Sequence, residues 1–327
     1  MPKKEYLDVV VRAVVQLTPR IREYLLAAPD GSALPAYDAG SHIELLISPE
    51  GIGNTRRHYS LVGGTPSAND GRMTYRIAVQ REDRARGSAH IHDKLAVGTR
   101  LSILPPKNEF RLDHRDGKSL LIAGGIGITP IFSMLRSLAF RKRPFEIVYS
   151  GRSRSAMAYV HEVAQLGREH AHIYCNDETG SQLNLTALLA AQPADCKVYI
   201  CGPAGLIEAA RAAAAALGWN PQRIRSELFT PPPTGDEVGF DVVLKQSGKT
   251  IAVGPNTSIL DALQNAGMYP LFDCRRGECG LCPLPVLEAD GPLVHRDRYL
   301  SAGEKSSGGT LCICVSRLQG SRLVLDA

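Results

Sequence analysis

Five of the eight cysteines in this 327-residue chain lie close to its C-terminus. Cys274, Cys279 and Cys282 form a C-x4-C-x2-C run, and Cys312 and Cys314 follow about thirty residues later. This spacing is typical of a plant-type [2Fe–2S] cluster, in which one loop supplies three thiolates and a distant strand supplies the fourth. Because such a cluster carries single electrons, the pattern predicts a chain that works in electron transfer.

Zinc is the alternative metal for these cysteines. Cys279 and Cys282 have the C-x2-C spacing of a zinc knuckle, but a tetrahedral site needs a second pair at comparable spacing. Only one residue separates Cys312 from Cys314, and we expect a strand there with both side chains on one face. The loop composition favours the cluster, because glycines bring backbone N–H groups to the sulfides and arginines offset the thiolate charge. These loop residues are Arg275, Arg276, Gly277 and Gly280.

The composition, 44% hydrophobic and 22% charged, is ordinary for a globular protein. The chain starts with alternating strand residues rather than an apolar signal segment, and no stretch approaches the ~18 apolar residues of a membrane span. The net charge of +5 comes from dispersed residues, unlike the basic stripe of a nucleic-acid binder. The other cysteines show no pairing logic, which fits a reducing compartment. We therefore expect a cytoplasmic monomer that binds neither nucleic acid nor a membrane.

The sequence pattern predicts a multi-domain chain. Short alternating strands over 1–115 indicate an antiparallel β-barrel, with strands at 7–15, 41–47, 73–81 and 100–104. Strand, turn and helix alternate over 116–229, which predicts an α/β parallel-sheet domain with strands at 120–123, 145–149, 172–175 and 198–201. Three consecutive prolines mark a linker over 230–237. Residues 238–327 begin like a β-grasp ferredoxin, with two strands around the Ser247-Gly248 turn and a helix between Ser258 and Gly267.

Glycine turns in the α/β part indicate a nucleotide site. The first runs through Gly124, Gly125 and Gly127 into a helix, where we expect Thr129 to cap and Pro130 to lie in the first turn. A helix N-terminus behind such a turn binds a pyrophosphate, although one turn alone is weak evidence because it can also be a tight strand–helix connection. A second strand ends in the same style, at Cys201, Gly202 and Pro203. Two such turns at the ends of parallel strands predict a dinucleotide crevice.

Three short segments of the barrel share an explanation once a nucleotide domain follows it. They are Arg57, His58, Tyr59 and Ser60 at the end of one strand, Ala78, Val79 and Gln80 on another, and Arg86, Gly87 and Ser88 on a loop. Arg57 can bind a phosphate, Tyr59 can flank an aromatic ring, and Ser60 can hydrogen-bond a flavin near N5. The third segment can complete the phosphate cradle through a guanidinium, a backbone N–H and a hydroxyl.

These motifs, in this order, resemble the phthalate dioxygenase reductase family, which includes vanillate demethylase reductases. The resemblance covers essentially the whole chain. It implies an FMN barrel, an NADH domain and a [2Fe–2S] domain in one polypeptide that serves as the reductase component of a multicomponent oxygenase. The FMN contacts that it implies are Arg57, Tyr59, Ser60, Ala78, Val79, Gln80, Gly87, Ser88 and Thr129. The phosphate loop departs from the family, because Gly87-Ser88-Ala89 stands where Gly-Gly-Ser is usual.

The resemblance also selects the fourth iron ligand. In the family this cysteine precedes Val-Ser-Arg, which makes it Cys314 and leaves Cys312 as a neighbour. Together with Cys274, Cys279 and Cys282 it would hold the cluster.

The resemblance implies a relay, in which NADH delivers a hydride to FMN and single electrons leave through the cluster. The acceptor would be a terminal oxygenase of the Rieske type acting on an aromatic or similar small substrate, with a cytochrome P450 as the alternative acceptor. Cys201 would abut the nicotinamide and Glu227 would lie at the flavin edge, although both are equally explained as ordinary sheet-end residues.

Several alternatives stay open at this point. No acid directly follows the second strand of the α/β part, and Arg152 and Arg154 can accept a 2′-phosphate, so NADPH competes with NADH. FAD competes with FMN. A partner-independent NAD(P)H:acceptor flavoprotein is a rival function, but it would leave the cluster without a use. A redox-sensing regulator is a second rival, which should carry a DNA-binding motif or a basic patch.

Overall fold

The computed structural model describes residues 6–49, 55–63, 74–82, 86–179, 183–229, 237–255, 257–272, 275, 277, 280–297 and 299–327. The chain forms two compact units. The larger unit comprises Met1–Leu46, Arg56–Arg81 and His90–Phe229, and the smaller unit comprises Ile47–Thr55, Glu82–Ala89 and Thr230–Ala327. Of the predicted linker, only Glu237 is among the described residues.

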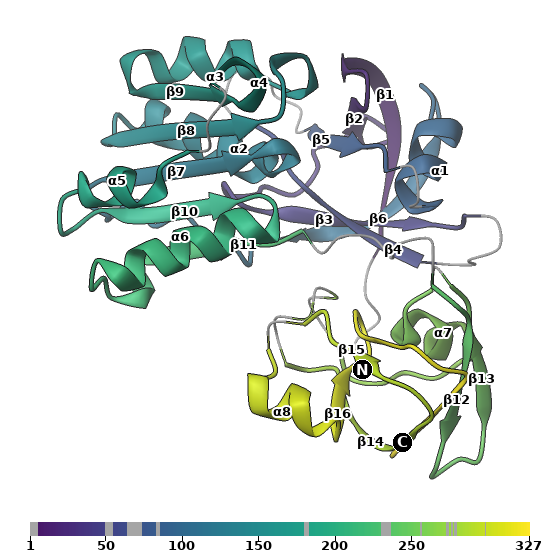
Figure 1. Cartoon of the computed structure of the whole chain (residues 1–327). Coiled ribbons are helices and arrows are strands. Elements are labelled where there is room, and N and C mark those ends of the chain that lie inside the picture. Colours follow the sequence, from purple (N-terminus) through teal and green to yellow (C-terminus); the bar gives the residue numbers. More distant parts are fainter. Residues whose placement is uncertain are drawn as a thin grey trace. The chain divides into compact units, whose positions relative to one another are not determined.

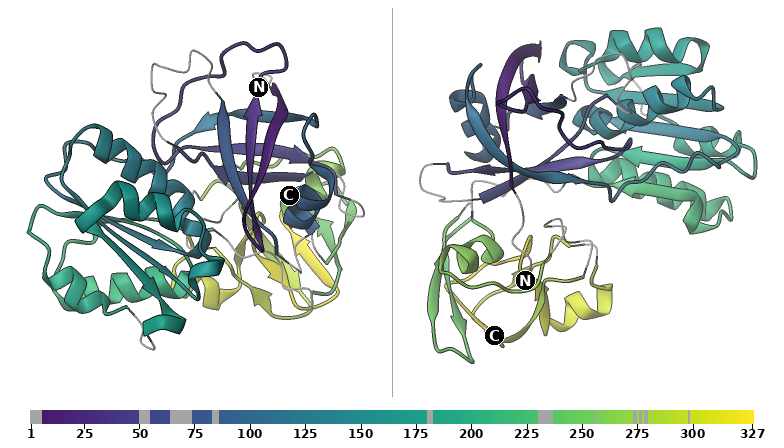
Figure 2. Two further views of the ribbon diagram at one scale, coloured as in Figure 1. Left: turned by 90° about the horizontal axis from the view of Figure 1, so that it is seen from above. Right: turned by 180° about the vertical axis from the view of Figure 1, so that it is seen from behind.

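The first sheet of the larger unit is antiparallel. Its strands are β1 (Leu7–Thr18), β2 (Ile21–Ala27), β3 (His42–Ile47), β4 (Thr55–Ser60), β5 (Tyr75–Gln80) and β6 (Arg100–Lys107). They follow the order β4–β3–β6–β1–β2–β5, and Figure 2 shows how strongly they twist around one another. An antiparallel bridge between Leu61 and Ile77 joins the end of β4 to β5. The first and last strands therefore meet, and the predicted antiparallel barrel is confirmed.

Two elements of this part were missed in the sequence. β2 forms a hairpin with β1, with Thr18 paired to Ile21. Its Arg, Glu, Leu and Ala residues are good helix formers, and only pairing with β1 and β5 makes the segment a strand. The second is α1 (Arg86–Lys94), which begins where a loop was predicted for Arg86, Gly87 and Ser88. That loop prediction is wrong. Glycine and serine have low helix propensity, and tertiary packing of the segment overrides this local preference.

The second sheet of the larger unit is parallel. Its strands are β7 (Ser119–Gly124), β8 (Phe145–Gly151), β9 (Ala171–Cys175), β10 (Lys197–Cys201) and β11 (Ile224–Glu227), in the order β11–β10–β7–β8–β9. Apolar residues of α2 (Ile128–Phe140) and α3 (Val160–Gly167) cover one face, and those of α5 (Leu185–Ala190) and α6 (Ala204–Ala216) cover the other (Figure 1). Shorter elements are α4 (Asn176–Thr179), η1 (Gly125–Gly127), η2 (Arg154–Ala156), η3 (Arg168–His170) and η4 (Pro221–Arg223). The predicted α/β sheet is confirmed, and its strand order reverses between β7 and β10.

The smaller unit has a mixed sheet in the order β13–β12–β18–β14–β16. These strands are β12 (Phe240–Leu244), β13 (Thr250–Val253), β14 (Pro283–Ala289), β16 (Thr310–Cys312) and β18 (Arg322–Leu325), while β15 (Leu293–Val294) pairs with β17 (Arg317–Leu318). The helices are α7 (Ile259–Asn265) and α8 (Ala302–Ser307). Ser258 caps α7 by accepting the N–H of Asp261, and Gly267 follows the helix at a φ of 79°. The predicted strand–turn–strand–helix start is confirmed.

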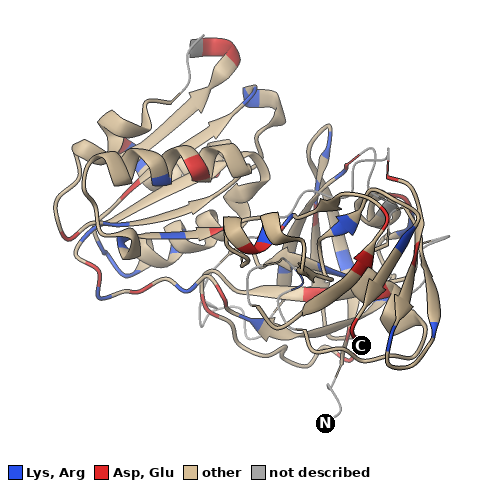
Figure 3. Ribbon diagram, turned by 60° about the horizontal axis from the view of Figure 1, so that its bottom comes forward, with Lys and Arg blue, Asp and Glu red and all other residues tan. Residues whose placement is uncertain are grey.

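Charged side chains of both signs are interspersed along the described ribbon (Figure 3). Some form ion pairs, such as Lys118 with Glu146 and Arg81 with Asp93. Within the described residues, each helix is too short or too polar to cross a lipid bilayer.

Candidate redox sites

The two predicted glycine turns touch each other at the carboxyl edge of the parallel sheet. β7 and β10 are neighbours, with Ala123 paired to Cys201. A Cβ on Gly127 would lie 2.3 Å from the carbonyl oxygen of Cys201, and a Cβ on Gly202 would lie 2.9 Å from the Cα of Gly124. Only glycine allows this backbone contact. The contact brings both turns to the N-terminus of α2, which is where doubly wound sheets bind a pyrophosphate.

The start of α2 differs from the prediction. The 3₁₀ turn η1 precedes the helix, whose N-cap is Gly127. The hydroxyl of Thr129 donates to the carbonyl of Ile126 at 3.1 Å, so the predicted cap by Thr129 is wrong. The reason is that the preceding 3₁₀ turn places the helix start before Thr129. Pro130 lies in the first turn, as predicted.

Cys201 and Glu227 lie side by side. They are paired in the register of β10 and β11, and both are buried, at 0% and 2% exposure. Cys201 belongs to a core cluster that also contains Ala78 of β5. The structure therefore brings the two residues together beside the glycine turns, with a barrel strand in the same cluster. Their contact with a nicotinamide or a flavin stays a prediction.

The other predicted flavin residues of the larger unit lie on the strands that close the barrel. Ser60 is buried at the end of β4, and Ala78 and Val79 are buried in β5. Gln80, the last residue of β5, is half-buried. The bridge between Leu61, just beyond Ser60, and Ile77 joins the end of β4 to the middle of β5. These residues therefore lie on neighbouring strands, and their contact with a flavin stays a prediction.

The tetrapeptide at the end of β4 does not present all its side chains together. Because side chains alternate along a strand, Arg57 and Tyr59 share one face. Burial raises the pKa of Tyr59, so the phenol is neutral at physiological pH. His58 points elsewhere, since its ring stacks on His42 of β3 with 5.0 Å between ring centroids. The structure therefore separates His58 from the pair.

The predicted phosphate loop forms the first turn of α1. Ser88 accepts a hydrogen bond from the N–H of Glu82 at 3.0 Å, and Gly87 is buried. The side chain of Arg86 lies outside the described part. A phosphate contact from this turn stays a prediction.

The same helix is tied to β5 by a buried histidine. His92 of α1 lies 2.9 Å through Nε2 from the carbonyl oxygen of Val79, and its own carbonyl accepts from Arg22 at 2.7 Å. Burial lowers the pKa of His92, which the Val79 carbonyl only partly offsets, and the guanidiniums of Arg22 and Arg81 lower it further. The imidazole is therefore neutral when it supports the strand.

We expect acid to weaken this support. The unfolded chain takes a proton on His92 near pH 6.5, while the folded chain resists until a lower pH, so stability is lost as the pH falls from about 6.5. Thermal unfolding between pH 7.5 and 5.5 measures this. His92→Phe should flatten part of the decline, whereas His90→Phe on the same helix should leave it unchanged. Equal slopes for wild type and His92→Phe would contradict the assignment.

The described cysteines of the smaller unit converge. The Sγ atoms of Cys282 and Cys314 are 3.2 Å apart, both residues are buried, and neither is in a disulfide. Hydrogen bonding with the thiols of Cys312 and Cys314 lowers the pKa of Cys282. Cys274 and Cys279 lie outside the described residues. Since thiolates are the ligands of plant-type clusters, the described cysteines fit a [2Fe–2S] site.

Cys312 and Cys314 do not lie on one strand, so that prediction is wrong. β16 ends at Cys312, and a turn follows in which Val315 and Ser316 donate their N–H groups to the Cys312 carbonyl at 3.2 and 3.0 Å. The two cysteines thus differ in setting, because Cys312 is held in the sheet and Cys314 in the turn.

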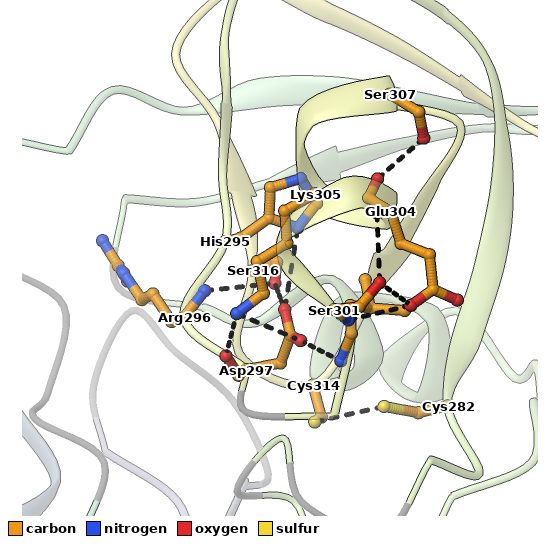
Figure 4. A network of polar contacts seen from close by, with 11 residues as sticks. Cys282, His295, Arg296, Asp297, Ser301, Glu304, Lys305, Ser307, Cys314 and Ser316 are labelled. Atoms are coloured by element: carbon orange, nitrogen blue, oxygen red, sulfur yellow. Dashed lines mark hydrogen bonds and ion pairs between the residues drawn. The ribbon is translucent and has the colours of Figure 1, made fainter. Parts of the chain in front are cut away.

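A buried carboxylate beside this turn was missed in the sequence. The side chain of Asp297 is 0% exposed; it accepts from Leu300 N–H at 2.9 Å and from Ser316 Oγ at 3.3 Å. His295 Nδ1 and Lys305 Nζ each lie 3.6 Å from it (Figure 4). These residues share no sequence motif with the cysteine loop. Only the fold brings them to it.

Asp297 and Tyr299 form one wall of the cysteine loop. A Cβ on Gly277 would lie 2.7 Å from the Cα of Asp297, and a Cβ on Gly280 would lie 2.1 Å from the Tyr299 ring. Both glycines have positive φ, of 73° and 71°. The loop glycines thus have a steric role that was not predicted, beyond the approach to sulfide.

Comparisons with known proteins agree with this geometry. Residues 99–224 match the family described as dimethylamine monooxygenase subunit DmmA-like, N-terminal domain, and residues 242–319 match the 2Fe-2S iron-sulfur cluster binding domain. The solved structure of phthalate dioxygenase reductase, described as modular for electron transfer from pyridine nucleotides to [2Fe–2S], aligns with a TM-score of 0.86 and 29% identity over 98% of each chain.

Two curated relatives match over nearly their whole length. The heme-dependent oxidative N-demethylase beta subunit of Ectopseudomonas mendocina is 40% identical over 321 residues, covering 98% of each chain. The putative reductase subunit of a toluene-4-sulfonate monooxygenase system of Comamonas testosteroni is 38% identical over 323 residues, again covering 98% of each chain.

Proposed function

The chain belongs to the phthalate dioxygenase reductase family of oxygenase reductase subunits, and we propose that it passes electrons from NADH through FMN and a [2Fe–2S] cluster to a terminal oxygenase. The observation that carries this is the coexistence, in one chain, of the glycine crevice and the converging cysteines. Of the rival functions, a partner-independent flavoprotein would have no use for these cysteines.

Each of the proposed sites has a task set by its residues. When bound, a flavin accepts a hydride and a cluster carries single electrons, which is the chemistry that the side chains themselves cannot supply. The glycine turns would hold the pyrophosphate, with Cys201 and Glu227 at the nicotinamide end. The barrel strands would hold FMN, with Ser60 near N5. In this proposal the FMN domain spans 1–115, the NADH domain 116–229, the linker 230–237 and the cluster domain 238–327.

We propose a Rieske-type oxygenase as the acceptor, as the resemblance implies. A cytochrome P450 is the second candidate, and the relative named a heme-dependent oxidative N-demethylase beta subunit favours a haem-containing acceptor. Stopped-flow mixing of the reduced chain with one purified oxygenase of each class distinguishes them by which acceptor spectrum changes. We also propose a cytoplasmic monomer, because the cysteines outside the cluster motif show no pairing logic in the sequence.

Anaerobic addition of NADH tests the relay. Both the flavin and the cluster absorbance should bleach, because the cluster can be reduced only through the flavin. Iron content is measured in the same sample. Bleaching of the flavin alone, in protein with two irons per chain, would contradict the relay.

A further inference from the structure

We propose that Glu178, held by Arg154, makes the nucleotide site select NADH over NADPH. This inference rests on the proposed function and adds a specificity-determining residue to it. The sequence left the choice of coenzyme open, because arginines follow the second strand of the α/β part and no acid does. The structure supplies an acid from the next strand.

The loops after β8 and β9 form one surface. Gly151 and Cys175 end these neighbouring parallel strands in register. Immediately beyond them, the N–H of Asp177 donates to the carbonyl of Arg152 at 3.1 Å. This bond fastens α4, which carries Glu178, to the segment that carries Arg154. Arg154 and Glu178, which are 24 positions apart in the sequence, therefore lie next to each other.

This surface lies on the adenosine side of the crevice. In doubly wound sheets a dinucleotide crosses the point where the strand order reverses, with its pyrophosphate at the first glycine turn. Here that point lies between β7 and β10. The proposed nicotinamide residues Cys201 and Glu227 end β10 and β11 on one side of it. The adenosine half then lies on the other side, over the ends of β8 and β9.

Glu178 engages the guanidinium of Arg154 in a bidentate pair. Nε donates to Oε1 and Nη2 to Oε2, both at 2.9 Å, while about half of each side chain is exposed. The hydrogen bonds from Arg154 lower the pKa of Glu178, so the carboxylate stays ionised at neutral pH. Arg154 therefore holds the carboxylate of Glu178 in place instead of binding the phosphate of a ligand.

The pair discriminates by charge. A ribose 2′-hydroxyl can donate a hydrogen bond to the carboxylate, whereas the 2′-phosphate of NADPH would find the guanidinium of Arg154 already paired and would meet the carboxylates of Glu178 and Asp177. Cys175, Asp177 and Glu178 also have ligand atoms within 4.8 Å of one another, which is a spacing that suits a metal. Arg154 already neutralises the charge of Glu178, which disfavours a cation, while each carboxylate oxygen keeps a second lone pair that can accept from a hydroxyl.

Glu178→Gln tests the proposal. It frees the guanidinium of Arg154 without changing the shape of the site, so kcat/KM for NADPH should rise about tenfold, and the gain should shrink at high salt. The double variant Glu178→Gln, Arg154→Ala should lose that gain. Asp113→Asn is the matched control, since it breaks a bidentate pair with Arg115 (3.0 and 2.8 Å) on the segment before β7 and should leave the coenzyme ratio unchanged.

The readout is flavin bleaching in stopped flow with each coenzyme. Two results would overturn the inference, provided that NADH reduces the wild-type flavin. One is an unchanged NADPH rate in Glu178→Gln, and the other is a gain in that rate that persists in the double variant. If neither coenzyme reduces the wild-type flavin, the proposed function itself fails, so the two failures are distinguishable.

Discussion

Cys314→Ser is expected to remove the [2Fe–2S] cluster and with it nearly all electron transfer to the oxygenase, a loss of at least about 100-fold. The substitution replaces the proposed thiolate ligand by a hydroxyl, which binds iron poorly at neutral pH. Cys312→Ser, at a fully buried position two residues away, should keep most of the cluster. The two variants make the same chemical change, so their difference isolates ligation from packing.

Iron content, the visible spectrum and the electron paramagnetic resonance of the reduced cluster measure the outcome. In Cys314→Ser, reduction of the flavin by NADH and its direct oxidation by ferricyanide should continue, because the larger unit is untouched. The assignment would be wrong if Cys312→Ser lost the cluster and Cys314→Ser retained it. The two positions can be compared because the thiols of Cys312 and Cys314 both lie within hydrogen-bonding reach of Cys282. Only Cys314 lies in the turn that follows β16.

Local rules predicted the elements whose signals are local. Ser258 and Gly267 delimit α7 because a cap and a positive-φ residue act within one turn of helix. The glycine turns were readable because close backbone contact admits no other residue. The cysteine run was readable because metal ligands come in fixed spacings.

Features that depend on distant partners were not predicted. β2 is a strand because of its neighbours, against the helix propensity of its residues. Asp297 reaches the cysteine loop only through the fold, and Glu178 reaches Arg154 only because β8 and β9 are adjacent. In each case the contact that gives the residue its role joins segments that no single stretch of sequence contains.

The second large effect is expected from Gly127→Ala. The added methyl carbon would lie 2.3 Å from the carbonyl oxygen of Cys201 and 2.7 Å from the nitrogen of Gly202, both backbone atoms that cannot turn aside. The two glycine turns must separate, which opens the proposed pyrophosphate site. We expect kcat/KM for NADH to fall about 100-fold and stability to fall by about 1–3 kcal/mol from overpacking.

Gly205→Ala is the control for this substitution. Gly205 lies in the first turn of α6, just after the second glycine turn, and a Cβ there would meet nothing within 4 Å. Alanine should stabilise the helix by about 0.5–1 kcal/mol and leave the reaction with NADH unchanged. Dithionite should still reduce both the flavin and the cluster of Gly127→Ala, since it needs no nucleotide site. A Gly127→Ala protein with the wild-type KM for NADH would show that the contact between the turns does not shape the coenzyme site.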